Sequence, residues 1–239
     1  MDSGDLLGIL KGEIQASMGC TDPGSVALGV ARAVQELGCP PDRIEVLVSP
    51  SVYKNGVGVG VPGTGERGLD QAAALGAVIG HPEAGLAILG RVDAPALAAA
   101  KALIEASRVR VGYGEGPDPL YVKATVSAGS LSASALIAGD YANFVEITRA
   151  GTVSFSKPIP RAEAAQDRLQ GAALKELFAL VPQLEPEDLG FLLEVAEVNL
   201  AAATAGLADQ GLSLGPSLAV RARIDGKEAA LPQPFAAMH

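Results

Sequence analysis

The apolar positions near the start of the chain repeat with the spacing of α-helices. Leu6 and Leu10 belong to a set of apolar residues that fall on one face over residues 4–17, which predicts a helix with one buried side. A second helix is expected to begin at position 23 or 24 and to run to position 37. Gly38 follows it, as glycine commonly does at a helix C-terminus.

Further helical spacing occurs in the middle and in the second half of the chain. Helices are expected near 68–79 and 94–106, the second with Asp93 as its N-cap and Pro95 in its first turn. Residues 161–210 also have the helical period, and they predict two or three helices, one of them starting after the stretch EPEDL.

Alternating apolar and polar residues predict strands at 43–49 and repeatedly over 108–156, the latter as antiparallel strands or hairpins. The resulting order of elements favours an α+β fold, with helices packed on a mainly antiparallel mixed sheet. No internal repeat or low-complexity linker divides the chain. We therefore expect a single domain over 1–239: helix-rich 1–107, β-rich 108–156, helical 161–210 and an irregular tail 211–239.

Composition narrows the class of protein. The chain has 239 residues, of which 49% are hydrophobic and only 4% aromatic, so aliphatic side chains must fill the core. The net charge of −9 provides no basic stripe for phosphates, which argues against a nucleic-acid partner. We find no signal pattern and no run of the ~18 apolar residues that a membrane span needs. A cytoplasmic protein with free thiols, away from the membrane, is expected.

Cys20 is the first candidate for chemistry. It lies in the stretch SMGCTDPGSVALG, directly before a predicted helix that Thr21 or Asp22 could cap and Pro23 could open. A thiol at the positive end of a helix dipole is expected to have a lowered pKa, and its thiolate would be a nucleophile or a metal ligand. A buried thiol without a role is the alternative. Because histidine occurs only at 81 and 239, a Cys–His hydrolase is not expected.

The stretch KNGVGVGVPGTG, 54–65, is the second candidate. Its alternation of glycine and valine predicts a strand with one bare face, which another backbone or a ligand could approach closely. Residues 58–63 match the dinucleotide motif G-x-G-x-x-G only weakly, because Pro62 interrupts the turn and no helix follows at once. Lys54 and Asn55 could bind a carboxylate or act in acid–base chemistry, and an exposed loop lysine is the alternative.

Together the two stretches resemble a known family. GCTDPGSVALGVA, VSPSVYKNGVGVGVPGTG, AAALGAVIGHPEAGLAIL and EVNLAAATAGL are similar, in order and spacing, to the iron–sulfur L-cysteine desulfidases and related L-serine dehydratase α-type proteins. The resemblance covers most of this chain and the N-terminal half of the family's usual length. It implies a lyase that eliminates sulfide or water from L-cysteine or L-serine, giving pyruvate and ammonia.

The resemblance also implies roles for particular residues. Cys20 would be a ligand of a 4Fe–4S cluster that polarises the leaving group, and Lys54 and Asn55 would be catalytic residues that hold the substrate. The positions assigned to substrate binding are Thr21, Asp22, Ser49, Gly56, Gly58 and Asn143.

Two features of the chain differ from the family pattern. The other cluster cysteines of the family are absent and Cys39 matches none of them, so a 4Fe–4S cluster is expected only in an assembled enzyme. The partner would be a C-terminal-half subunit with further cysteines, or the chain would form a homo-oligomer. In DYANF, Asn143 is kept, whereas Tyr141 and Ala142 stand where the family has His and Thr.

Two other functions stay open at this point. The chain could be an inactive homologue that binds a small molecule or another protein. A nucleotide-binding enzyme rests on the glycine match alone.

Overall fold

The chain divides into two compact units. The computed structural model describes residues 1–14, 19–159, 169 and 171–207. The larger unit is Ile14–Arg168, and the smaller one combines Met1–Glu13 with Leu169–His239. The single domain expected over 1–239 stays a prediction, and the tail at 211–239 lies outside the described residues.

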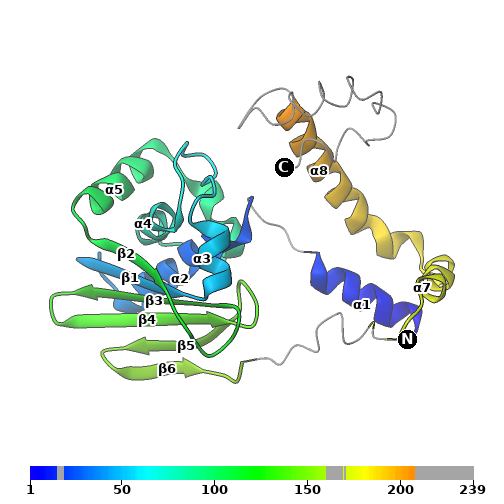
Figure 1. Ribbon diagram of the computed structural model, residues 1–239, viewed down its shortest axis with the longest axis horizontal. Helices are drawn as coiled ribbons and strands as arrows, with labels where there is room; N and C mark the ends of the chain where they lie inside the picture. The colour runs from blue at the N-terminus through cyan, green and yellow to red at the C-terminus, as the bar shows by residue number, and fades with distance from the viewer. Residues whose placement is uncertain (15–18, 160–168, 170, 208–239) are drawn as a thin grey trace. The chain divides into compact units, whose positions relative to one another are not determined.

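The larger unit is built on one sheet of six strands in the order β2-β1-β3-β4-β5-β6 (Figure 1). β1 and β2 pair in parallel, and each of the other neighbouring pairs is antiparallel. The α+β class with a mainly antiparallel mixed sheet is therefore confirmed. The strands are β1 (Arg43–Val48), β2 (Val109–Tyr113), β3 (Tyr121–Ala128), β4 (Leu131–Ala138), β5 (Phe144–Arg149) and β6 (Thr152–Ser156).

Helices cover one face of this sheet (Figure 1). Gly29 of the central helix, α2, lies so close to β3 that a Cβ there would be 3.4 Å from Cγ1 of Val122. Ile44, Val46 and Val48 of β1 point into the same core, and the residues that alternate with them are exposed. The helices of this unit are α2 (Thr21–Leu37), α3 (Pro50–Gly56), α4 (Leu69–Ile79), the 3₁₀ helix η1 (Pro82–Arg91) and α5 (Ala94–Glu105).

The ends of α2 and α5 follow the local signals in the sequence. Gly38 has a φ of 81° and its N–H donates to the carbonyl of Val34, as expected for a glycine that ends a helix. Oδ1 of Asp93 accepts a hydrogen bond of 2.8 Å from the N–H of Ala96, which confirms Asp93 as the N-cap of α5.

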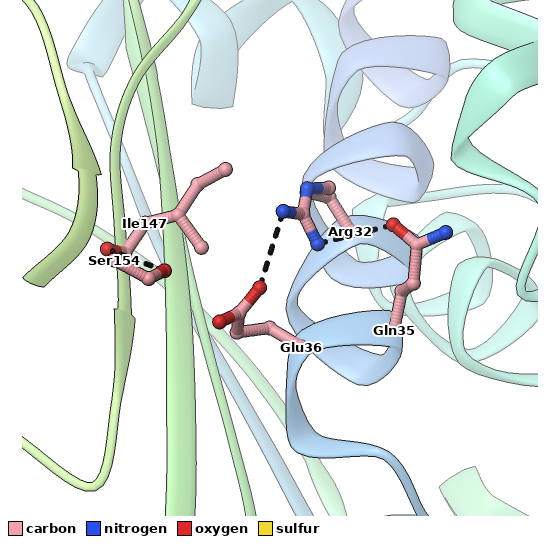
Figure 2. Close-up of polar contacts among 5 residues, drawn as sticks. All are labelled: Arg32, Gln35, Glu36, Ile147 and Ser154. Atoms are coloured by element: carbon pink, nitrogen blue, oxygen red, sulfur yellow. Dashed lines mark hydrogen bonds and ion pairs between the residues drawn. The ribbon is translucent and has the colours of Figure 1, made fainter.

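Polar side chains occupy the C-terminal half of α2 (Figure 2). Arg32 pairs with Glu36 at 3.1 Å and donates to Oε1 of Gln35 at 3.0 Å. Figure 2 shows Arg32 and Glu36 extending from the helix toward the strands that carry Ile147 and Ser154. An i,i+4 pair of this kind contributes about 0.3–0.5 kcal/mol. The start of α2, where Cys20 lies, has a separate set of polar contacts.

The smaller unit is helical, as the spacing over 161–210 predicted. Leu6 and Ile9 of α1 are buried, and the ammonium of Lys11 lies 5.9 Å from the ring centre of Phe191. The last described helix begins directly after EPEDL. The elements are α1 (Ser3–Glu13), α7 (Leu174–Leu180), η2 (Val181–Gln183), η3 (Pro186–Leu189) and α8 (Gly190–Leu207).

The strand predicted for the glycine stretch is wrong. Residues Pro50–Gly56 form α3 instead, and the chain then turns, with a single bridge between Gly60 and Arg67. Proline fixes φ at a helical value, so Pro50 favours a helix start directly after β1. Gly58 has open space around it, so the close approach expected on a bare strand face does not occur there.

Candidate functional site

The start of α2 is the centre of the candidate site. Cys20 is the N-cap residue, with extended backbone angles, and its side chain makes no capping hydrogen bond. Thr21 and Asp22, expected as possible caps, lie inside the first helical turn, and Pro23 is the third helical residue rather than the first. The helix therefore begins one residue after the cysteine, so the thiol lies beside the free N–H groups of its first turn.

The Cys20 thiol donates a hydrogen bond to Oδ2 of Asp22 at 3.2 Å. Burial raises the pKa of the Cys20 thiol, and the Asp22 carboxylate raises it further, while the nearby Asp22 amide acts in the opposite direction. The lowered pKa expected from the helix dipole is therefore wrong. Burial and the neighbouring carboxylate keep the proton on this thiol at neutral pH.

The Asp22 carboxylate is buried and has few hydrogen-bond partners. Its exposed fraction is 2%, and burial raises its pKa, while contacts with the Cys20 and Asn55 side chains act in the opposite direction. Its second oxygen, Oδ1, has no hydrogen-bond partner within the part of the chain that the structure describes. A buried carboxylate oxygen without a partner is costly, so this atom is positioned for a proton or a ligand.

Tyr141 reaches the same place from the loop between β4 and β5. Burial raises the pKa of its hydroxyl, and the charge of Asp22 raises it further, while a contact with the Thr21 side chain acts the other way. The hydroxyl is thus a neutral donor beside Asp22. Tyr141 was noted in the sequence only as a departure from a family pattern, and only the tertiary structure brings it to α2.

Two more buried polar groups lie near the starts of α2 and α4. Oγ of Ser25 and Nε2 of Gln71 have no partners among the described residues, although their residues are 0% and 4% exposed. Leu69, in the same turn of α4 as Gln71, packs against Gly56 at the end of α3. Asn55, next to Gly56, contacts the Asp22 side chain. The end of α3 therefore links the first turns of α2 and α4. A polar residue within an alanine-rich helix was the only signal for Gln71 in the sequence.

Some predicted site residues lie elsewhere in the unit. Ser49 is buried at the opposite end of α3 from Asn55, with its Oγ 3.0 Å from that of Ser51, beside a cavity of about 300 Å³. Asn143 donates its Nδ2 to the carbonyl of Ala138 at 2.8 Å and holds the β4–β5 loop. Lys54 and Gly58 are exposed, and Gly56 is buried against Leu69. The structure thus brings together Cys20, Thr21, Asp22 and Asn55.

The described residues do not fit an iron–sulfur cluster by themselves. Among them, no three His, Cys, Asp or Glu side chains are placed to share a metal ion. Cys39 follows the C-terminal end of α2, a helix about 25 Å long. It lines a largely apolar cavity of about 830 Å³ and cannot join Cys20. One thiol is too few for a cluster, so a 4Fe–4S group in an assembled enzyme stays a prediction.

The chain is similar to curated proteins that are named UPF0597 proteins. It is 44% identical over 219 residues to a UPF0597 protein of Methanocella arvoryzae, covering 91% of this chain and 51% of that protein. It is 36% identical over 214 residues to a UPF0597 protein of Vibrio campbellii and 37% identical over 221 residues to one of Oleidesulfovibrio alaskensis, covering 88% of this chain and 50% of each. The chain thus spans about half the length of the curated relatives it matches.

These comparisons correct the family inferred from the sequence motifs. The relatives carry the name UPF0597 protein, and their names mention neither a desulfidase nor a dehydratase. The assignment to the iron–sulfur L-cysteine desulfidase and L-serine dehydratase family is therefore wrong. No protein-family model and no solved structure matches the chain.

Proposed function

We propose that the Cys20 site is one part of the active site of a lyase that removes sulfide or water from a small β-substituted amino acid, L-cysteine or L-serine. The observation that carries the proposal is the hydrogen bond from Cys20 to Asp22, a buried carboxylate with a raised pKa and an unpartnered oxygen. Perturbed, buried titratable groups that contact one another are typical of acid–base sites.

Elimination needs a base and an acid on the same small substrate. The base takes the proton on Cα, a double bond forms between Cα and Cβ, and the departing sulfur or oxygen takes a proton from the acid. The enamine product then reacts with water to give pyruvate and ammonia. Asp22 suits the base, because its raised pKa strengthens its affinity for a proton.

The neutral donors of the site suit the acid. The hydroxyl of Tyr141 and the thiol of Cys20 both have raised pKa values, so each carries its proton at neutral pH. The free N–H groups in the first turn of α2 favour the substrate's carboxylate, as helix N-termini favour anions generally. The chain's own residues therefore supply binding and proton transfer.

The proposed enzyme includes a partner, because the relatives are about twice as long as the matched region. The partner is a subunit that corresponds to the unmatched half and carries further cysteines, or a second copy of the chain. A 4Fe–4S cluster would need Cys20 as a thiolate, together with ligands outside the described residues, and in that assembled enzyme Tyr141 would be the proton donor.

The test is pyruvate formation from L-cysteine and L-serine, with the chain and a polypeptide for the unmatched half, under anaerobic conditions with iron and sulfide. Activity that is lost in Asp22→Asn and in Tyr141→Phe but kept in Cys39→Ser supports the proposal. Absence of pyruvate from both substrates would contradict the lyase.

The second candidate, a small-molecule binding module, is favoured by the single thiol at the site. Titration calorimetry with L-cysteine and L-serine separates the two functions. Binding that is lost in Asp22→Asn, without any turnover in the assembled protein, would indicate the binding module.

A further inference from the structure

The helix α8 is apolar on all sides yet largely exposed. Leu193 and Val198 are 70% and 69% exposed, Leu200 is 55% exposed, and Ala203 alone of the described residues in α8 is fully buried. A helix that is apolar all round is normally buried in protein or in a membrane. The surface of α8 therefore lacks a covering element within the described part of the chain.

Helix α7, in the same unit, also exposes apolar side chains. Leu174 and Phe178 are 70% and 67% exposed, and Val181, the C-cap of α7 and first residue of η2, is 45% exposed. The spacing i, i+4, i+7 is that of a helix face that docks into a partner. We call the six residues Leu174, Phe178, Val181, Leu193, Val198 and Leu200 the α7–α8 surface.

The side chains between these apolar residues argue for a protein partner rather than a lipid one. The segment Pro186–Leu207 is long and apolar enough to cross a membrane, although its sequence holds no unbroken run of ~18 apolar residues. Length and composition do not distinguish such a span from a helix that packs on protein. α8 carries Glu194 and Glu197 and no Lys or Arg, the opposite of a helix adapted to an anionic membrane surface.

The lengths of the relatives identify the occupant. The matched regions cover about 90% of this chain and only about half of each relative, so each relative has about as much chain again outside the match. We propose that the α7–α8 surface binds the polypeptide that corresponds to this unmatched half. Fully burying one large apolar side chain contributes about 1.5–3 kcal/mol, and these six are 45–70% exposed, so their burial would favour association and offset part of its entropic cost.

The proposal predicts that this chain and the unmatched half, supplied as two polypeptides, form a one-to-one complex. The probe is the half of the Methanocella arvoryzae relative that this chain does not match, expressed on its own and mixed with the full chain. Light scattering after gel filtration measures the mass of the complex, and calorimetry measures its Kd. We expect Leu193→Glu and Val198→Glu each to raise the Kd about tenfold or more, because each buries a charge in the interface.

The matched control is Val153→Glu on β6, an apolar residue that is 52% exposed but lies in the other unit. It should leave the Kd unchanged. Circular dichroism checks that each variant is still helical, and Phe178→Glu on α7 provides a second test if an α8 variant unfolds.

Several outcomes would overturn the proposal. They are no complex with the unmatched half, a complex that the glutamate variants leave unchanged, a homodimer that those variants abolish, and binding of the chain to phospholipid vesicles through α8. A rise in dye binding at α8 after removal of residues 208–239 would assign the cover to that segment and overturn it too. None of these measurements depends on lyase activity, so failure here is distinct from failure of the proposed reaction.

Discussion

Gly76 of α4 lies directly against the backbone of Ala27 of α2. A Cβ added at position 76 would lie 2.8 Å from Cα of Ala27, closer than real Cβ atoms come to a neighbour. The C-terminal ends of both helices line one cavity, so α2 and α4 run in the same direction. Their first turns, which carry Asp22 and Gln71, are consequently at the same end of the helical layer.

The close contact at Gly76 predicts a specific loss of stability. Gly76→Val should lower the free energy of unfolding by about 1–3 kcal/mol, because the new side chain forces two packed helices apart. Urea unfolding followed by circular dichroism measures the change. Gly58→Val is the matched control, since Gly58 has open space around it, and it should change the free energy by no more than about 0.5 kcal/mol. Equal effects at both positions would refute the packing.

Replacing the Cys20 thiol should abolish activity and leave the stability of the protein nearly unchanged. Cys20→Ser keeps a donor for Asp22, so the free energy of unfolding should change by no more than about 1 kcal/mol. Pyruvate formation by the assembled lyase should be lost, whereas Cys39→Ser should keep it. Unchanged pyruvate formation in Cys20→Ser would rule out a chemical role for this thiol.

The raised pKa of Cys20 predicts slow alkylation at neutral pH. In a Cys39→Ser background, the rate of reaction with iodoacetamide should rise with a midpoint above the ordinary cysteine value of about 8.5. Asp22→Asn should move this midpoint down, because it removes a negative charge beside the thiol. The same chain in urea serves as the reference. A midpoint below that of the unfolded chain would show that the helix dipole dominates.

The raised pKa of Asp22 should make the stability of the protein depend on pH in an unusual direction. Its pKa is higher in the folded protein than in the unfolded one, so the folded state binds this proton more tightly. The resulting stabilisation is full below the unfolded pKa of about 3.9 and is lost as the pH rises through the folded pKa. The free energy of unfolding of wild type, relative to Asp22→Asn, should therefore fall as the pH rises from 4 to 7. A rise over this range would contradict the burial of the carboxylate.

Most elements of the larger unit were predictable from the sequence because their signals are local. α2, α4 and α5 have helical spacing with a terminal glycine or an aspartate cap, and the strands from β2 to β6 alternate clearly. α3 was missed because the alternating Val-Gly pattern that follows it resembles a strand. The sequence shows the alternation, and it does not show that Pro50 already starts a helix directly after β1.

The candidate site, like the fold, was predictable from the sequence only in part. Cys20 and Asp22 are two residues apart, so their association at a helix start followed from the sequence alone. The sequence could not place Tyr141 and Gln71, since their relation to Cys20 depends on how a loop and a second helix pack on α2. The direction of the thiol's pKa was predicted wrongly for the same reason.

By itself, the sequence determined the α+β class, the positions of most elements and the cysteine at the start of α2, because hydrophobic period and capping residues act over a few positions. Only the tertiary structure decided which polar groups are buried together and what their pKa values are. Desolvation depends on everything that surrounds a group, and those surroundings come from residues far apart along the chain.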